Sequence, residues 1–222
     1  MLVAPRPWSA LGPGTADVLR PGLPDAVDAA IAAIDRELPL FRGRLDGELG
    51  RNIRRGVQVA LDRFLDLLGT DAPALDARSE QVYAAFGEGE GSHGRSMDTL
   101  LGAYRIGARV TWGSFAAAAI RAGITTGDLV VLAEAIFAYI DEISAASAVG
   151  YARQQAAQAG QRNARRARLA EVLLTGTAVP DVAELRRLAA GAAWSLPATV
   201  AVAVVPLSGA AERTPVTVRG RR

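Results

Sequence analysis

The feature that most constrains the fold is an unbroken helical pattern between residues 128 and 176. This segment contains no proline, and its apolar residues Leu129, Leu132 and Ile136 recur at the three- and four-residue steps that place side chains on one helix face. A helix of that length would span roughly 70 Å, about twice the width of a small domain. We therefore expect its first half to pack within a helical bundle and its second half to leave that bundle as a stalk.

Length and composition favour a globular chain without thiol chemistry. Half of the 222 residues are apolar, which is enough for a hydrophobic core. Cysteine is absent, which excludes disulfides, thiolate metal sites and catalysis by a thiol. The formal net charge of +2 is too small a surplus to indicate binding to nucleic acid or to a membrane.

The sequence predicts a soluble, cytoplasmic protein. The N-terminal residues lack the basic start and the apolar run that define a signal peptide. No uncharged apolar run reaches membrane-spanning length, since the nearest one, 127–137, is interrupted by Glu134. Every basic residue is arginine, and alanine and glycine are abundant, which is the codon bias of a GC-rich genome.

The chain before the stalk divides into a leader and a helical domain. Residues 1–23 are rich in proline and glycine and predict an extended, disordered leader, in which Trp8 is the residue suited to dock on the domain. The helical domain, residues 24–152, contains the first part of the long helix and four predicted helices, at 25–38, 46–68, 77–86 and 96–122. Between the last two, the glycine-rich segment 87–94 predicts a flexible connector. The apolar helix 96–122 is expected to be the most buried element.

The long helix changes character near Tyr151. Its first half carries large apolar residues, whereas the heptad positions of the stalk, residues 153–176, carry alanine and polar residues. Two such helices would approach closely but bury little area, so we predict a homodimer whose weak seam can shift in register. The predicted seam consists of Val149, Ala152, Ala156, Ala159 and Asn163.

Past the stalk the periodicity changes again. Residues 181–193 predict a short helix, and the β-branched run 198–207 predicts a buried strand. One helix and one strand cannot bury each other's faces, so we expect 177–207 to begin an α/β domain whose remainder is missing. Residues 208–222 predict a disordered tail, and we expect the chain to be truncated. The predicted fold class is thus an all-α bundle with a long C-terminal helix, followed by a truncated α/β fragment.

A cluster of charged and aromatic residues has two interpretations. Arg105 and Arg109 lie on the apolar helix 96–122, whose expected antiparallel neighbour is the long helix. Buried charges need partners, which favours ion pairs between the two helices. The alternative is that an arginine holds an anionic ligand in a pocket lined by aromatic rings. The residues available to either arrangement are Tyr104, Arg105, Arg109, Trp112, Glu134, Tyr139 and Asp141.

The sequence predicts no catalytic, metal or cofactor site, and we do not expect an enzyme. The single histidine, His93, lies in the glycine-rich segment without other ligating residues nearby, which favours a solvent-exposed side chain. No nucleophile is spaced to meet an acid–base partner. A basic cluster in the stalk lacks interleaved aromatic residues, which favours a solvated helix face over a nucleic-acid contact. This cluster consists of Arg162, Arg165, Arg166 and Arg168.

Three segments together resemble the N-terminal region of actinobacterial PucR-type, or CdaR-like, transcriptional regulators. They are LLGAYRIGARVTWGSF at 100–115, LAEAIFAYIDEISAASAVGYA at 132–152 and RRARLAEVLLTG at 165–176. The same region is similar to the N-terminal domain of RsbT co-antagonist proteins. The resemblance covers about residues 25–205 and provides no catalytic residues.

The resemblance implies an all-helical, globin-like sensory and dimerisation domain without haem, then a GGDEF-like α/β domain and a DNA-binding helix-turn-helix. We therefore expect this chain to be the N-terminal part of a PucR-like transcription regulator that relays a signal through the long helix. The signal would be an unknown small-molecule effector, and DNA would be bound only by a helix-turn-helix absent from this chain. The alternative is a stressosome-type scaffold, similar to RsbT co-antagonist proteins, that engages other proteins and controls no promoter.

Overall fold

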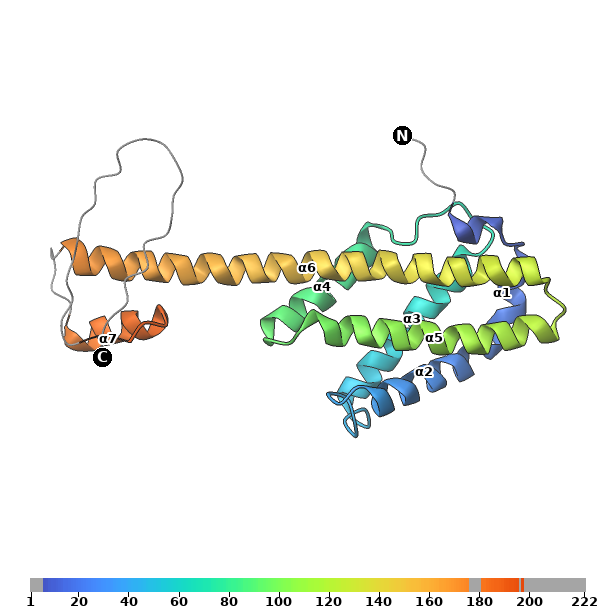
Figure 1. Ribbon diagram of the computed structural model, residues 1–222, viewed down its shortest axis with the longest axis horizontal. Helices are drawn as coiled ribbons and strands as arrows, with labels where there is room; N and C mark the ends of the chain where they lie inside the picture. Colours follow the sequence, from blue (N-terminus) through green and yellow to red (C-terminus); the bar gives the residue numbers. More distant parts are fainter. Residues whose placement is uncertain (1–5, 176–180, 196, 198–222) are drawn as a thin grey trace. The chain divides into compact units, whose positions relative to one another are not determined.

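A computed structural model describes residues 6–175, 181–195 and 197 of the chain. The chain divides into two compact units, residues 1–155 and 156–222, which we describe separately. Every regular element in the described ranges is a helix, so the predicted all-α bundle with a long helix is confirmed (Figure 1). None of the described helices combines the length and the apolar character needed to cross a membrane.

Most of the N-terminal segment 7–22 is helical, so the extended leader predicted there is wrong. Its elements are η1 (Pro7–Ala10), α1 (Gly14–Leu19) and η2 (Arg20–Gly22), followed directly by α2 (Leu23–Glu37). Prolines occupy the first positions of η1, η2 and α2, where a helix needs no backbone N–H donor. Trp8 is buried as predicted, and its indole N–H donates a 3.1 Å hydrogen bond to the carbonyl oxygen of Ala72.

Four further helices complete the first unit. They are α3 (Glu48–Leu67), α4 (Ala77–Ser92), α5 (Met97–Arg121) and the first part of α6 (Thr126–Thr175). Gly69 follows α3 with a φ of +77°, a conformation that favours glycine and ends the helix. Ser96 begins α5 by accepting a 3.1 Å hydrogen bond from the backbone N–H of Asp98. A short turn then makes α5 and α6 antiparallel (Figure 1).

The glycine-rich segment 87–94 is not the flexible connector that composition predicted, because α4 continues to Ser92. Here α4 crosses α6 with backbone against backbone. A Cβ atom added at Gly87 would lie 1.8 Å from the carbonyl oxygen of Ser147. One added at Gly150 would lie 1.9 Å from the carbonyl oxygen of Ala84. The packing of α4 on α6 therefore offsets the cost of about 1 kcal/mol that each glycine brings to a helix.

The core of the first unit is aromatic at its centre. Phe64 of α3 stacks on Phe115 of α5 with ring centroids 6.5 Å apart, and lies 5.6 Å from the ring of Tyr139 on α6. Helix α5 is not the most buried element, contrary to the prediction. Its side chains Leu100 and Tyr104 are only half-buried because they border a cavity rather than solid core.

The second unit, described over 156–175 and 181–195, packs a short helix on the end of α6. This helix, α7 (Val182–Gly191), confirms the helix predicted at 181–193. Leu169 of α6 is buried against Ala189 and Ala192. The predicted strand 198–207 and tail 208–222 lie outside the described residues, so the α/β fragment predicted at 177–207 stays a prediction.

Replacing Gly150 by alanine should strongly destabilise the first unit. The added methyl group would overlap the carbonyl oxygen of Ala84, which cannot rotate away, so α4 and α6 would have to separate. We expect the free energy of unfolding to fall by about 3 kcal/mol, the upper range for overpacking, as measured by urea denaturation.

The matched control is Gly113→Ala, on α5, where an added Cβ has no atom within 4 Å. This change should raise the free energy of unfolding by up to about 1 kcal/mol, because alanine is the better helix former. Equal effects of the two substitutions would contradict the close crossing.

Candidate functional site

A cavity of about 370 Å³ in the first unit is lined mainly by α3, α4, α5 and α6, and Ile34 of α2 and Phe41 also border it. At its inner end are the buried side chains of Phe64 and Ile143. At its rim are Leu49 and Phe86, which are 47% and 42% exposed, so the cavity opens to solvent. Its volume falls within the range of small-molecule sites, roughly 300 to 1,000 Å³. The arrangement can therefore admit a ligand from solvent into an apolar interior.

Small residues on two helices create this space. Gly56 of α3 and Gly107 of α5 both line the cavity, yet a Cβ added at either would have no atom within 4 Å. These glycines therefore differ from Gly87 and Gly150, whose missing side chains permit a close helix contact. Ala103 also lines the cavity from α5. At these positions the sequence leaves room where a protein interior is normally filled.

Three tyrosines of the lining carry hydroxyl groups with hydrogen-bond partners. The hydroxyl oxygens of Tyr83 and Tyr139 are 3.5 Å apart, and that of Tyr104 is 3.0 Å from the hydroxyl oxygen of Ser147. Burial raises the pKa of all three tyrosines above the ordinary value of 10.0. The phenols thus stay neutral at physiological pH.

Thr111 contributes a fourth hydroxyl group, and this one is unsatisfied. The residue lines the cavity from α5 and is only 2% exposed. Its Oγ1 atom has no hydrogen-bond partner in the part of the chain that the structure describes. A buried hydroxyl without a partner costs about 1–3 kcal/mol, so such groups are uncommon outside functional sites.

The formal charges in the lining form one ion pair. The Nε and Nη2 atoms of Arg95 donate hydrogen bonds of 2.8 and 2.5 Å to the two carboxylate oxygens of Glu90. The two-point contact neutralises both groups, and the carboxylate is well covered, with 14% of its side chain exposed. This end of the cavity therefore presents a paired charge rather than a free cation.

The residues predicted as a pocket or as ion pairs separate into two groups. Tyr104 and Tyr139 line the cavity, whereas Arg105, Glu134 and Asp141 are exposed. Trp112 is half-buried against the core. The predicted partners on the long helix are wrong for Arg109, whose Nη2 atom instead donates hydrogen bonds of 2.7 and 2.6 Å to Glu37 on α2.

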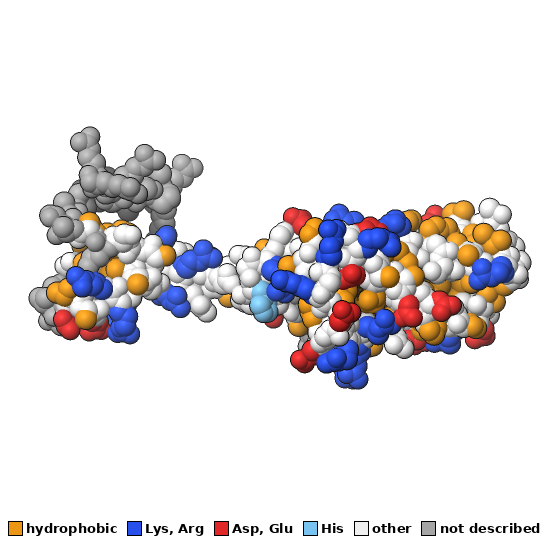
Figure 2. Space-filling model, turned by 90° about the horizontal axis from the view of Figure 1, so that it is seen from below, with side chains coloured by type: hydrophobic (Ala, Val, Ile, Leu, Met, Phe, Trp, Pro, Cys, Tyr) orange, Lys and Arg blue, Asp and Glu red, His pale blue; other side chains and the backbone are white. Residues whose placement is uncertain are grey.

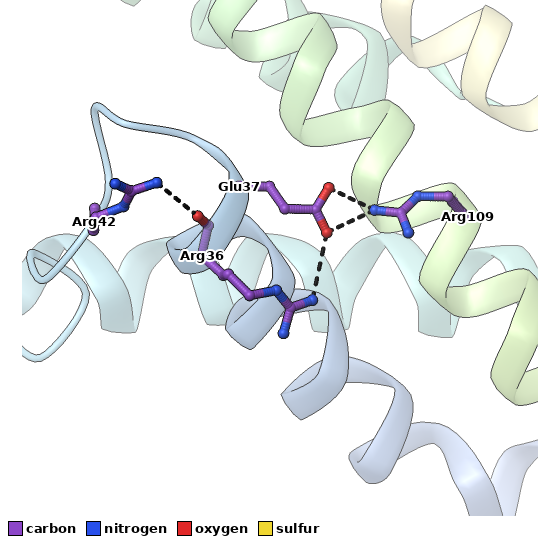
Figure 3. Close-up of polar contacts among 4 residues, drawn as sticks. All are labelled: Arg36, Glu37, Arg42 and Arg109. Carbon is purple, nitrogen blue, oxygen red and sulfur yellow. Dashed lines mark hydrogen bonds and ion pairs between the residues drawn. The ribbon is translucent and has the colours of Figure 1, made fainter.

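Figure 3 shows Arg109 reaching from α5 to the end of α2. Arg36 lies against the same carboxylate at 3.4 Å, and Arg42 donates a 3.1 Å hydrogen bond to the carbonyl oxygen of Arg36. The hydrogen bond from Arg109 lowers the pKa of Glu37 below its ordinary value. These groups are solvent-exposed, so the cluster serves as a surface contact between α2 and α5 rather than as a buried charge.

Helix phase explains which site residues the sequence prediction missed. Tyr104 and Thr111 are seven residues apart and share one face of α5, whereas Arg105 and Arg109 follow their inward-facing neighbours by one position and turn outward. Counting seven residues on from Tyr104 would therefore have identified Thr111 as a residue on the same helix face. No helical spacing in the sequence indicated the ion pair of Glu90 and Arg95, because this pair depends on the unexpected length of α4.

The other predicted surfaces can also be placed. The five seam residues, Val149, Ala152, Ala156, Ala159 and Asn163, are all exposed. Of the basic cluster, Arg168 lies 3.3 Å from Glu171, and the Nε atom of Arg166 donates a 3.5 Å hydrogen bond to the carbonyl oxygen of Ala192. Figure 2 shows arginine and acidic side chains interspersed on the face of the first unit that it presents. His93 is exposed, and no group of three potential metal ligands occurs among the described residues.

The raised tyrosine pKa values predict a loss of stability at alkaline pH. Above pH 10 the unfolded chain releases its phenolic protons while the folded chain retains them, so stability present below pH 10 is lost as the pH rises. Each buried tyrosine adds a slope of at most about 1.4 kcal/mol per pH unit. Tyr139→Phe should make the decrease between pH 9 and 11 shallower in urea denaturation. Parallel pH profiles of the variant and the parent would contradict this assignment.

The chain is similar to one known protein family. A family model described as the PucR-like N-terminal domain matches residues 8–174. The match begins at Trp8, includes every helix that lines the cavity, and ends one residue before the end of α6. No curated protein and no solved structure gave a match.

Proposed function

This chain belongs to the PucR-like N-terminal domain family, and we propose on that premise that it is the sensory, regulatory N-terminal part of a transcription regulator. A small molecule bound in the cavity is the signal, and α6 relays it toward GGDEF-like and helix-turn-helix domains. DNA binding belongs to the latter domain. The proposal gives this chain no catalytic role and no cofactor.

The observation that carries the proposal is that α6 belongs to both the cavity and the stalk. Ile136, Tyr139 and Ile143 of α6 line the cavity, and the helix continues without interruption to Thr175. A ligand that fills the cavity therefore contacts the helix that would carry the signal. It shifts the population of α6 positions if it binds one of them more tightly than another.

The crossing of α4 and α6 offers a second route to the same helix. Phe86 and Glu90 of α4 line the cavity, and Gly87, which lies between them in sequence, makes the backbone contact with α6. A displacement of α4 by a ligand must be followed by α6, because atoms in direct contact leave no gap to absorb the movement.

A second candidate is a stressosome-type protein-interaction domain. It is favoured by the apolar residues Val130 and Phe137 of α6, which are 55% and 58% exposed. They are seven residues apart and so lie on one helix face, where a partner protein would cover them. In this alternative a cavity ligand would leave the stalk unchanged, which the following experiment tests.

Ligand binding in the cavity should alter hydrogen exchange in the stalk. We expect two-ring probes, either 2-naphthol or 2-naphthoate, to increase amide protection at 100–111 and to change the exchange of peptides covering 156–175. Hydrogen-exchange mass spectrometry of the full chain with and without each probe measures both effects. Protection confined to the lining would contradict the relay and favour the protein-interaction domain.

The control fills the cavity from within. Ala103 lines the cavity, so Ala103→Phe should abolish probe binding, as measured by isothermal titration calorimetry. Ala117 is an exposed residue of the same helix, and Ala117→Phe should leave binding unchanged. Equal binding by both variants would place the probes outside the cavity.

The proposal includes a homodimer formed by paired α6 helices. The seam residues are exposed in the single chain and follow the heptad spacing that lets two helices meet. Static light scattering of the full chain at tens of micromolar should give twice the monomer mass of 23.1 kDa. A monomer under these conditions would contradict the pairing.

Two double variants locate the dimer contact. Ala156→Glu with Ala159→Glu places four like charges at the seam of a dimer and should weaken dimerisation at least tenfold, or about 1.4 kcal/mol. Ala157→Glu with Ala164→Glu adds the same charge to exposed positions beside the seam and should have a clearly smaller effect. Equal weakening would exclude the predicted seam.

A further inference from the structure

We propose that the cavity binds a free single-chain amphiphile, whose unbranched alkyl chain of about 12 carbon atoms lies along α3 while its polar head stays in solvent at the rim. This inference rests on the proposed sensory function and names the ligand class of the same site. It requires no hydrogen bond inside the cavity, because the apolar lining recognises the chain and the head remains outside.

The cavity is long relative to its volume. Its lining residues on α3 extend from Leu49 at the rim to Phe64 at the inner end, and they recur between these two at three- and four-residue steps. The rise of an α-helix places the two end positions about 22 Å apart, which is about four turns. One face of α3 therefore borders the cavity along most of the helix.

Volume and length together indicate a single chain. An apolar cavity of about 150 Å³ holds one benzene molecule, so a cavity of about 370 Å³ accommodates roughly 15 non-hydrogen atoms. An extended chain advances about 1.2 Å per bond, so 15 atoms in line reach about 17 Å. A compact ring system with as many atoms would fill one part of the cavity and leave the rest of the lining without van der Waals partners. A linear ligand contacts the lining over most of its length.

Three glycines on three helices keep this space open. Gly56 of α3, Gly89 of α4 and Gly107 of α5 line the cavity, and a Cβ atom added at any of them would have no atom within 4 Å. Glycine inside a helix lowers the stability of that helix, and at these positions no close helix contact offsets the cost. An alkyl chain that passes between the three helices supplies the missing contacts.

The interior suits the chain and the rim suits the head. Ile53 and Val57 present aliphatic side chains from α3, and Asn52 of the same helix is an exposed lining residue. The side chain of Arg95 is 37% exposed, and Glu90 engages its Nε and Nη2 atoms, so Nη1 can donate to a head group. A carboxylate at this rim keeps its hydration and needs no buried counter-ion.

The first test compares ligands by length and by shape. Undecanoate and 2-naphthoate have the same carboxylate and the same number of non-hydrogen atoms, whereas octanoate is a shorter chain. Isothermal titration calorimetry on the full chain at pH 7, below the micelle concentration, should show undecanoate binding at least tenfold more tightly than octanoate. The reason is that each buried CH₂ group strengthens binding about threefold to fourfold. Undecanoate should also bind at least tenfold more tightly than 2-naphthoate.

The second test blocks the cavity halfway along α3. Gly56 lies about 10 Å from Leu49 along the helix, so Gly56→Leu leaves room near the rim for a short chain only. Undecanoate should then bind within about threefold of octanoate, and octanoate should bind within about threefold of its affinity for the parent chain.

The matched control is Gly113→Leu on α5. Gly113 is exposed and lies outside the lining, and an added Cβ there also has no atom within 4 Å. This variant should bind octanoate and undecanoate as the parent chain does. Circular dichroism should show the parent melting temperature or a higher one for both variants, since leucine is the better helix former. The comparison of the three ligands on the parent chain needs no variant.

A third arm separates a free amphiphile from a membrane lipid. Flotation with dioleoylphosphatidylcholine vesicles should leave the full chain unbound, because the cavity accommodates one chain and this lipid carries two longer ones. Vesicle binding that Gly56→Leu abolishes would overturn the proposal in favour of a membrane lipid.

The outcomes separate this inference from the proposed function. Binding of 2-naphthoate as tight as that of undecanoate would overturn the single-chain class, while loss of that binding in Ala103→Phe would uphold the sensory site. Equal weakening of octanoate and undecanoate by Gly56→Leu would overturn the placement of the chain along α3. Failure of all three ligands to bind would overturn the cavity as a sensory site and, with it, the proposed function.

Discussion

The backbone contact between α4 and α6 is the constraint on which the rest of the first unit depends. Tyr83 lies four residues before Gly87 on the same face of α4, so the close approach at the glycine also brings the Tyr83 hydroxyl to 3.5 Å from that of Tyr139. Ile143 and Gly150 likewise share one face of α6 because they are seven residues apart. One helix–helix contact therefore determines both the end of the cavity and its polar lining.

The helices were predictable where local pattern decides the structure. Apolar periodicity and caps such as Ser96 located α5 and α6 within a few residues, and the absence of proline identified the long helix. The glycine-rich end of α4 was not predictable in this way. Glycine disfavours helix by local propensity, whereas at Gly87 the decisive partner is Ser147, far along the chain. The N-terminal segment was missed because its prolines occupy the positions where helices tolerate them.

In the candidate site, too, some residues were predictable from the local sequence pattern and others were not. Tyr104 and Tyr139 were identified because aromatic residues on apolar helices mark the interior, but charge alone misplaced Arg105 and Arg109. An arginine on an otherwise apolar helix suggests a buried charge, but its long side chain can easily reach solvent. Thr111 was not predicted as a site residue, since a single hydroxyl group on such a helix usually bonds to the backbone. Its significance appears only when the packed structure leaves the Oγ1 atom without a partner.

The weakness of the predicted α6 seam is consistent with the scale of signal that a cavity of this kind can generate. Coupling between two binding sites is typically about 1–3 kcal/mol, which a tightly packed interface would resist. A seam of Ala152, Ala156 and Ala159 buries little apolar area per residue, so moving from one register to another would cost an amount of this order. Larger residues at these positions would stabilise a dimer more firmly. They would also fix one register so strongly that a ligand of roughly 15 atoms could not change it. A relay of the proposed kind therefore requires small seam residues, and the alanines that would make the stalk a poor coiled coil would also suit it to that proposed role.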